Sequence, residues 1–352
     1  MRFSYFACMR SAGEFQKFIR PFSQKLLALD VGLLPMSAYS KRYLQHLFDH
    51  HLYYLEIYAD VLDQLMRHSS KAQAEIHLVD FGAGNGLLGF FAKFAGFKKV
   101  WLCDMDAHFV NASKLLAGAL ELDMDGFINC NVDTLQSALA DHQIDAVIAT
   151  DVIEHIYSLE DFLATIANMN PAMVTVFTTA SNPDNFLKCR QLKKLQLQDE
   201  LHGSNPSDSQ LAGSEKTEAF FVSRKKIIAE MFPHLPKTDL ISLSIATRGL
   251  IKADIVAAVN TYLQNGTKPQ PDTRWANTCN PLNGSWTERI LGIEVYKRIY
   301  KQQGFNVELQ NGFYNTHRGG WKRYINFAGN IFVILTGKYA APFISIIGYK
   351  PS

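Results

Sequence analysis

The amino-acid sequence predicts an α/β fold built on a doubly wound, mostly parallel sheet. Strand-like and helix-like segments alternate between residues 76 and 179, and this alternation is typical of a parallel sheet with helices on both faces. A glycine-rich turn follows the first strand, and the second strand ends in an acid about twenty residues later, which is the arrangement of nucleotide-binding folds.

The elements of this sheet follow one another with short connections. They are Ile76–Phe81, Leu87–Ala95, Lys99–Asp104, Ala107–Leu122, Gly126–Asn131, Ile144–Thr150, Leu159–Asn168 and Met173–Thr179. Before them, apolar residues recur at helical spacing between Lys41 and Met66, which predicts one long amphipathic helix. After them, Ser285–Glu288 has the pattern of a capping box, so we expect a helix from there to Tyr300. Phe305–Leu309 and Pro342–Lys350 have the pattern of two last strands.

The glycine-rich turn points to a particular kind of ligand. Its glycines permit positive φ angles and a close approach of the backbone to a ligand. A dinucleotide would need a third glycine three residues after the second, whereas here Gly86 comes two residues after Gly84. A carboxylate at Asp80 would repel a pyrophosphate but could accept hydrogen bonds from the ammonium group of a methionine moiety. We therefore expect the turn to bind S-adenosyl-L-methionine through Asp80, Gly82, Ala83, Gly84 and Gly86.

Three segments, in order, resemble the motifs of class I S-adenosylmethionine-dependent methyltransferases. They are residues 79–86, Asp104 and residues 144–155. The Asp-Val-Ile-Glu-His sequence at 151–155 is similar to the branch that contains the ubiquinone-biosynthesis O-methyltransferases. The resemblance implies a seven-stranded, Rossmann-like sheet that closes with an antiparallel pair, and the two last strands suit that role. It also implies S-adenosyl-L-methionine as the cofactor.

The second strand supplies the residues expected at the ribose and the adenine. We assign Asp104 to the ribose hydroxyls and Met105 to the face of the adenine, and we expect Asp106 to cap the following helix. An alternative is that both acids cap that helix.

Residues after the third and fourth strands complete the expected cofactor site. Asn131 or Asp133, with Val132 between them, would face the adenine amino group; an ordinary turn rich in Asn and Asp is the alternative. Asp151 follows the fourth strand, where open α/β sheets bind ligands, and we expect it beside the methionine part and the reacting methyl group.

His155 is the candidate general base, because a neutral imidazole can take a proton from an attacking hydroxyl. We therefore assign catalytic roles to His155 and Asp151. The alternative is that Glu154 and His155 only orient the loop by hydrogen bonds. Asp151, Glu154 and His155, with His202, could also hold a divalent ion, but we assign no metal.

Four regions are expected along the chain. Residues 1–74 form an N-terminal helical lid, 75–183 the cofactor half of the core, 184–284 an insertion that covers the acceptor pocket, and 285–352 the last helix and strands.

Composition limits the cellular setting and the partners. The formal net charge is +2 over 352 residues, which gives no global argument for nucleic acid, and the basic residues at 188–194 and 224–226 are expected to be solvated helix faces. Cysteines at 8, 103, 130, 189 and 279 lack C-x-x-C spacing, so we expect a reducing, cytoplasmic setting. The first ten residues lack a signal-peptide pattern, and the apolar segment 324–335 is too short to span a bilayer.

The reaction expected from these features is direct in-line methyl transfer, with O-methylation of a small-molecule, lipid-like or glycan acceptor. An RNA methyltransferase or an inactive methyltransferase-like binding protein are the alternatives. The segment 317–335 could contact a membrane surface peripherally, although we expect it to cover the sheet. The sequence predicts no transmembrane segment and no particular oligomeric state.

Overall fold

A computed structural model describes residues 13–203, 218–271 and 276–350. Residues 1–10 and Cys8, on which part of the localisation prediction rests, lie outside these ranges. The chain divides into two compact units. The first unit consists of the described parts of 1–152, 160–178 and 297–352, and the second unit of the described parts of 153–159 and 179–296.

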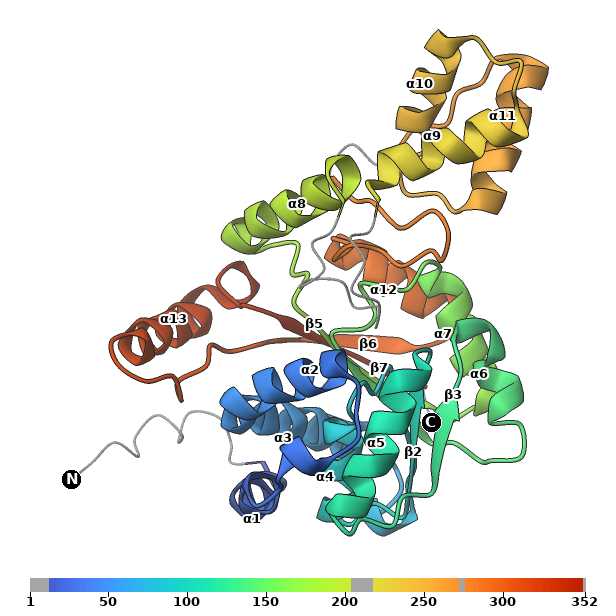
Figure 1. Cartoon of the computed structure of the whole chain (residues 1–352). Coiled ribbons are helices and arrows are strands. Elements are labelled where there is room, and N and C mark those ends of the chain that lie inside the picture. Colours follow the sequence, from blue (N-terminus) through green and yellow to red (C-terminus); the bar gives the residue numbers. More distant parts are fainter. Residues whose placement is uncertain (1–12, 204–217, 272–275, 351–352) are drawn as a thin grey trace. The chain divides into compact units, whose positions relative to one another are not determined.

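The first unit contains a seven-stranded sheet (Figure 1). Its strands are β1 (His77–Phe81), β2 (Lys99–Asp104), β3 (Gly126–Asn129), β4 (Ala146–Thr150), β5 (Val174–Thr179), β6 (Asn306–Asn311) and β7 (Ile344–Tyr349). Their order is β3-β2-β1-β4-β5-β7-β6. Strands β1 to β5 pair in parallel with one another, and β6 and β7 pair antiparallel. The predicted α/β fold with a mostly parallel sheet and a closing antiparallel pair is confirmed.

Helices cover this sheet because its central strands are apolar on both faces. The helices that lie wholly or almost wholly in the first unit are α1 (Gln16–Leu27), α2 (Ala38–Asp49), α3 (His51–His68), α4 (Leu87–Ala95), α5 (Ala107–Ala119), α6 (Val132–Ala138), α7 (Leu159–Met169) and α13 (Lys322–Thr336). All of them except α13 bury residues. Every residue of β5 is buried, as expected for a parallel strand covered on both sides. Helix α4 is also largely buried, and Phe91 packs against Phe22 of α1 with ring centroids 5.5 Å apart.

The long helix predicted from Lys41 to Met66 is wrong, because the structure has two helices that meet at His50. The backbone of His50 leaves the helical region, with φ −127° and ψ 19°. Nδ1 of His51 lies 2.6 Å from the carbonyl oxygen of Phe48, so a side chain satisfies a carbonyl at the end of α2. The helical spacing of apolar residues continues from α2 into α3, so the sequence pattern does not reveal the break at His50.

The second unit contains a helical layer built around one buried ion pair. Its helices are α8 (Phe186–Leu201), α9 (Phe220–Met231), α10 (Lys237–Ala246) and α11 (Lys252–Asn265). Arg224 is fully buried and pairs with both carboxylate oxygens of Glu200, while its Nε donates to the carbonyl of Ser244 at 3.0 Å. The expectation of a solvated face at 224–226 is therefore wrong for Arg224, because its charge is matched inside the unit.

The capping box predicted at Ser285–Glu288 is also wrong. In this segment the backbone N–H of Trp286 donates to the carbonyl of His155 at 3.1 Å, and that of Arg289 donates to Glu154 at 3.0 Å. These bonds tie the segment to residues 154 and 155, and the last core helix, α12 (Ile293–Gln302), begins only at Ile293.

Helix α13 does not cover the sheet as expected, since none of its residues is buried. Among the described residues, no helix combines the length and the apolar character that crossing a membrane requires.

Candidate cofactor and acceptor site

The turn between β1 and α4 requires glycine at three positions. Gly82, Gly84 and Gly86 have φ angles of 67°, 53° and 86°, a region that other residues rarely occupy. A Cβ atom on Gly82 would lie 2.6 Å from the side chain of Val152, and one on Gly86 would lie 2.8 Å from Leu102. The backbone N–H groups of Gly82 and Ala83 both donate to the carbonyl of Cys103, at 2.8 and 3.0 Å. The turn is therefore fixed to the end of β2.

Asp80 is a buried carboxylate at the carboxyl end of β1. Its Oδ2 accepts a hydrogen bond from the N–H of Gly89, in the first turn of α4, at 2.9 Å. The side chain is 2% exposed, and this burial raises the pKa of Asp80 to about 7, with a further increase from the nearby Asp104 carboxylate. A cationic ligand group would favour the ionised form of Asp80.

Asp104 connects the end of β2 to the glycine-rich turn. Its Oδ2 accepts from the N–H of Gly84 and its Oδ1 accepts from the N–H of Asp106, both at 2.8 Å. Each carboxylate oxygen has two acceptor sites, so the arrangement suits the hydroxyl pair of a ribose. Asp106 caps α5 by accepting from His108 N–H at 2.8 Å, which confirms its predicted role. The side chain of Met105, between them, is 61% exposed.

The predicted adenine residues lie at the start of α6. Asn131 is the N-cap of this helix and accepts from the N–H of Thr134 at 3.1 Å. Its Nδ2 donates to Oδ2 of Asp133 at 3.4 Å, and Val132 is the first residue of the helix. The cap is the ordinary role that the sequence left open, and contact of Asn131, Val132 or Asp133 with an adenine stays a prediction.

Helix α2 lies against the glycine-rich turn. Nδ2 of Asn85 donates to the carbonyl of Ser40 at 3.0 Å, and a Cβ atom on Gly84 would lie 3.4 Å from the ring of Tyr43. Tyr43 was not among the expected site residues, because a tyrosine in an amphipathic helix has the pattern of an ordinary core residue. A side chain at position 84 would therefore contact the ring of Tyr43.

Asp151 lies directly after β4 in a strained conformation. Its φ is 54°, and its N–H donates to the carbonyl of Thr178 at 3.0 Å. Non-glycine residues in this region are often found at functional sites. Burial raises the pKa of Tyr54 to about 12, and the carboxylate of Asp151 contributes to the increase. Burial also raises the pKa of Tyr43 and Tyr53, and the Asp151 carboxylate adds to the increase, so Asp151 lies near tyrosines of α2 and α3.

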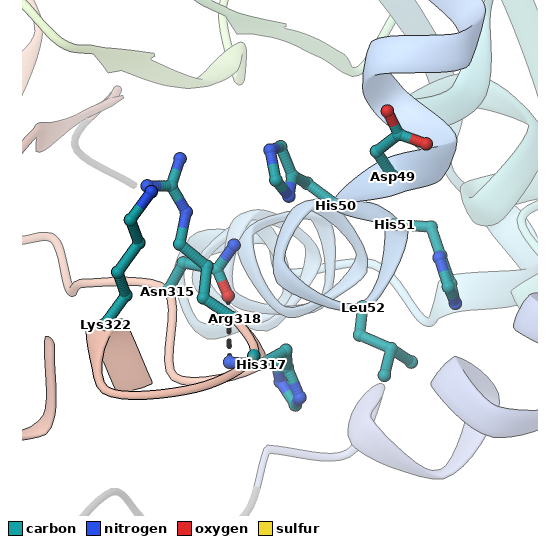
Figure 2. Close-up of a pocket in the computed structure, with 9 residues that line it drawn as sticks. Asp49, His50, His51, Leu52, Asn315, His317, Arg318 and Lys322 are labelled. Atoms are coloured by element: carbon teal, nitrogen blue, oxygen red, sulfur yellow. Dashed lines mark hydrogen bonds between the residues drawn. The ribbon is translucent and has the colours of Figure 1, made fainter. Parts of the chain in front are cut away.

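A pocket in the first unit lies where α2 meets α3 (Figure 2). Its volume is about 480 Å³, which is within the usual range of small-molecule sites. Figure 2 shows that its lining comes from the α2–α3 junction and from the loop before α13. The lining residues are Asp49, His50, His51, Leu52, Asn315, His317, Arg318, Gly319 and Lys322.

The lining of this pocket contains two cations, Arg318 and Lys322, and one carboxylate, Asp49. Burial lowers the pKa of His50, and His46 and Arg318 lower it further. Arg318 also acts on Tyr54, where its charge opposes the effect of Asp151. Tyr54 is linked to the pocket through His46: its hydroxyl lies 3.2 Å from Nε2 of His46, whose ring centroid is 5.2 Å from that of His50. The sequence analysis did not identify this pocket, because its two halves are more than 250 residues apart.

His155 and Glu154 belong to the second unit, whereas Asp151 belongs to the first. Nδ1 of His155 lies 2.8 Å from the carbonyl oxygen of Trp286, so this nitrogen carries the proton and Nε2 is the acceptor in the neutral ring. Glu154 is buried. Within the described ranges, no three His, Cys, Asp or Glu side chains are grouped as ligands of a metal ion.

The segment that contains these motifs matches a known family. Residues 79–170 match the family described as "Methyltransferase domain". The strand order is that of the class I methyltransferase, Rossmann-like fold. No curated protein matches the sequence.

Solved structures with similar folds are distant from this chain. Phosphoethanolamine N-methyltransferase 2 of Haemonchus contortus, in complex with S-adenosyl-L-methionine, is 12% identical with a TM-score of 0.37. The match covers 83% of this chain and 52% of that one, so this chain spans about half its length. Magnesium protoporphyrin IX methyltransferase of Synechocystis is 11% identical with a TM-score of 0.41, covering 86% and 85% of the two chains. A mycolic acid cyclopropane synthase is 12% identical with a TM-score of 0.40, covering 95% and 93%.

Proposed function

We propose that the protein is an S-adenosyl-L-methionine-dependent methyltransferase. The observation that carries the proposal is the pair of buried carboxylates, Asp80 and Asp104, on either side of a turn made of positive-φ glycines. The geometry suits a ligand with an ammonium group at one end and a ribose at the other. The family match over residues 79–170 supports the same assignment.

Residues at the ends of three strands, β1, β2 and β3, would bind different parts of this cofactor. Asp80 would accept hydrogen bonds from the ammonium group, and Asp104 would accept them from the ribose hydroxyls. Met105 would cover the adenine, and Asn131, Val132 and Asp133 would lie at its edge. When bound, S-adenosyl-L-methionine supplies a sulfonium methyl group for in-line attack by the acceptor.

His155 would act as the general base for an acceptor hydroxyl. The carbonyl of Trp286 orients the ring through Nδ1, which leaves Nε2 to take the proton. Asp151 would lie beside the methionine part of the cofactor and its reacting methyl group, near the tyrosines of α2 and α3. Catalysis would consist mainly of positioning and proton removal.

The acceptor would be a small-molecule, lipid-like or glycan alcohol that carries an anionic group. The pocket at the α2–α3 junction supports this class, because the two cations of its lining, Arg318 and Lys322, outnumber its one carboxylate, Asp49. Its link to Tyr54 through His50 and His46 supports its use for the acceptor. O-methylation by a cytoplasmic enzyme is our proposal for the reaction and its setting.

Incubation with S-adenosyl-L-methionine labelled in its methyl group and a fractionated cell extract tests this function. We expect label in an anionic small-molecule or lipid fraction, with the bond stability typical of a methyl ether. Label in RNA would favour the alternative nucleic-acid function, whose binding would also weaken steeply with salt. Absence of transfer to every fraction would favour an inactive binding protein.

Substitution of Arg318 tests the acceptor pocket. Arg318→Ala should raise KM for the labelled acceptor by roughly tenfold or more, since a charged hydrogen bond contributes about 1.5–3 kcal/mol. Cofactor affinity should not change. Arg298→Ala, which removes an exposed cation outside the pocket, is the matched control and should leave KM unchanged. An equal effect of both substitutions would contradict the assignment.

A further inference from the structure

Helix α13 presents large apolar residues to solvent and its two asparagines to the protein. Asn330 exchanges hydrogen bonds with the backbone of Tyr314: its Oδ1 accepts from the N–H at 2.7 Å, and its Nδ2 donates to the carbonyl at 3.1 Å. Nδ2 of Asn326 donates to the carbonyl of Asn315 at 2.5 Å. Gly329 lies between these two asparagines, and a Cβ atom there would lie 2.8 Å from the Tyr314 ring. The helix is thus anchored by its small and polar face.

The opposite face of α13 is apolar and exposed. Leu335 is 73% exposed, Trp321 68% and Phe332 60%. The other large exposed residues of this face and its ends are Tyr324, Ile325, Phe327, Ile331, Ile334 and Tyr339. A continuous apolar surface of this kind marks a site of contact with another apolar phase or molecule.

The charges around this face select the kind of partner. Residues 309–352 contain no Asp or Glu, whereas Arg318, Lys322, Arg323 and Lys338 are cationic. A second copy of α13 would bring the same cations together, and the carboxylates beside this segment, Asp49 in the pocket and Glu56 at His317, belong to α2 and α3 and not to this face. An anionic surface with an apolar interior complements both the charges and the apolar face.

Aromatic residues stand at both ends of the helix, with Trp321 and Tyr324 at its start and Tyr339 after its end. Trp and Tyr are enriched at the boundary between lipid headgroups and acyl chains. The helix has 15 residues, so it extends for about 22 Å, which suits a helix that lies along the interface.

We propose that α13 is a membrane-docking helix that inserts its apolar face into the surface of a bilayer of anionic phospholipid. Arg318, Lys322, Arg323 and Lys338 would contact the headgroup phosphates. This inference rests on the surface of α13 and not on methyl transfer. Because Arg318 and Lys322 also line the pocket, a bound membrane would lie beside the proposed acceptor site.

Co-sedimentation of the full chain with vesicles tests the proposal. We expect binding to vesicles of phosphatidylcholine and phosphatidylglycerol in equal parts, little binding to vesicles of phosphatidylcholine alone, and weaker binding at higher salt. The double variant Phe332→Glu/Leu335→Glu should bind at least about tenfold more weakly, with an unchanged melting temperature because both side chains are exposed.

The matched control adds the same two charges elsewhere on exposed apolar residues of the first unit. Leu27 and Leu33 are 58% and 81% exposed, and Leu27→Glu/Leu33→Glu should bind the mixed vesicles as the wild type does. Failure of the wild type to bind these vesicles would overturn the proposal, as would equal loss in both double variants. A dimer that light scattering detects without vesicles, and that only the α13 variant dissociates, would overturn it in favour of contact between copies. The affinity of the wild type for S-adenosyl-L-methionine is measured in parallel. Lack of binding would contradict the proposed function and leave the membrane-docking proposal unaffected.

Discussion

The carboxylate of Asp104 accepts a hydrogen bond from the backbone N–H of Gly84 at 2.8 Å, twenty residues earlier in the chain. The residue expected to bind the ribose thus also holds the turn expected to bind the methionine part. A change at Asp104 should therefore affect the whole cofactor site.

We expect Asp104→Ala to weaken S-adenosyl-L-methionine binding by about 1–3 kcal/mol, because charge-assisted bonds to the ribose are lost. Isothermal titration calorimetry measures this change. Asp106→Ala is the control: it removes the cap of α5 and should lower the unfolding free energy by about 1 kcal/mol while cofactor affinity stays close to that of the wild type. An unchanged affinity in Asp104→Ala would move the ribose role to another residue.

Asp80 should make cofactor binding and stability depend on pH in opposite senses. Its pKa in the folded protein is about 7, above the ordinary value of 3.8, so the folded state keeps a proton that the unfolded chain releases. Between these two values the stability contributed by Asp80 falls as pH rises, by up to about 1.4 kcal/mol per pH unit. Cofactor affinity should rise over the same window, because the ionised carboxylate attracts the ammonium group.

The variant Asp80→Asn checks this coupling, since its amide oxygen can still accept from Gly89. At about pH 8 we expect a higher melting temperature than that of the wild type and a much weaker affinity for S-adenosyl-L-methionine. Denaturation monitored across the pH range, with and without cofactor, gives both quantities. A variant that is less stable than the wild type at that pH would show that Asp80 is not a destabilising buried charge.

The glycine at position 82 should not tolerate a side chain. Gly82→Ala combines a positive φ with a Cβ atom 2.6 Å from Val152, so we expect a loss of at least about 2 kcal/mol of unfolding free energy. Gly118 lies in α5 with open space around its Cβ position, and Gly118→Ala should stabilise the protein by about 0.5–1 kcal/mol. Chemical denaturation of both variants is the measurement; similar effects at the two positions would contradict the geometry.

His155 can be tested as a base separately from its contact with Trp286. His155→Asn keeps an N–H donor for the carbonyl of Trp286 but has no basic nitrogen. Turnover should fall by roughly 10²–10⁴-fold, with cofactor affinity nearly intact and no response to chelators. Loss of activity with a chelator, restored by Mg²⁺ and mimicked by Glu154→Ala, would instead indicate a metal ligand. Nearly full activity in His155→Asn would leave the residue with an orienting role.

The sequence predicted the sheet well because its signals are local. The apolar strands, the glycines at 82, 84 and 86 and the cap at Asp106 depend only on neighbours in the chain. The break at His50 was missed, because the apolar period continues through α2 and α3. The false capping box at Ser285–Glu288 has a different origin: backbone hydrogen bonds from Trp286 to His155 and from Arg289 to Glu154, which lie 131 and 135 positions earlier, decide its conformation.

The pocket and the outward face of α13 could not be predicted for a related reason. His50 and Arg318 are brought together by the fold, and neither residue type is unusual at its position. The apolar pattern of α13 is the same whether that face points inwards or outwards. Only the bonds of Asn326 and Asn330 to the loop before the helix show which face the protein uses.

Calorimetric titration of the full chain with S-adenosyl-L-methionine, its demethylated product and NADH tests the central claim most directly. The carboxylate at Asp80 and the short Gly84-x-Gly86 turn predict that both sulfur compounds bind at one site and that NADH does not. Binding of NADH without binding of S-adenosyl-L-methionine would contradict the account.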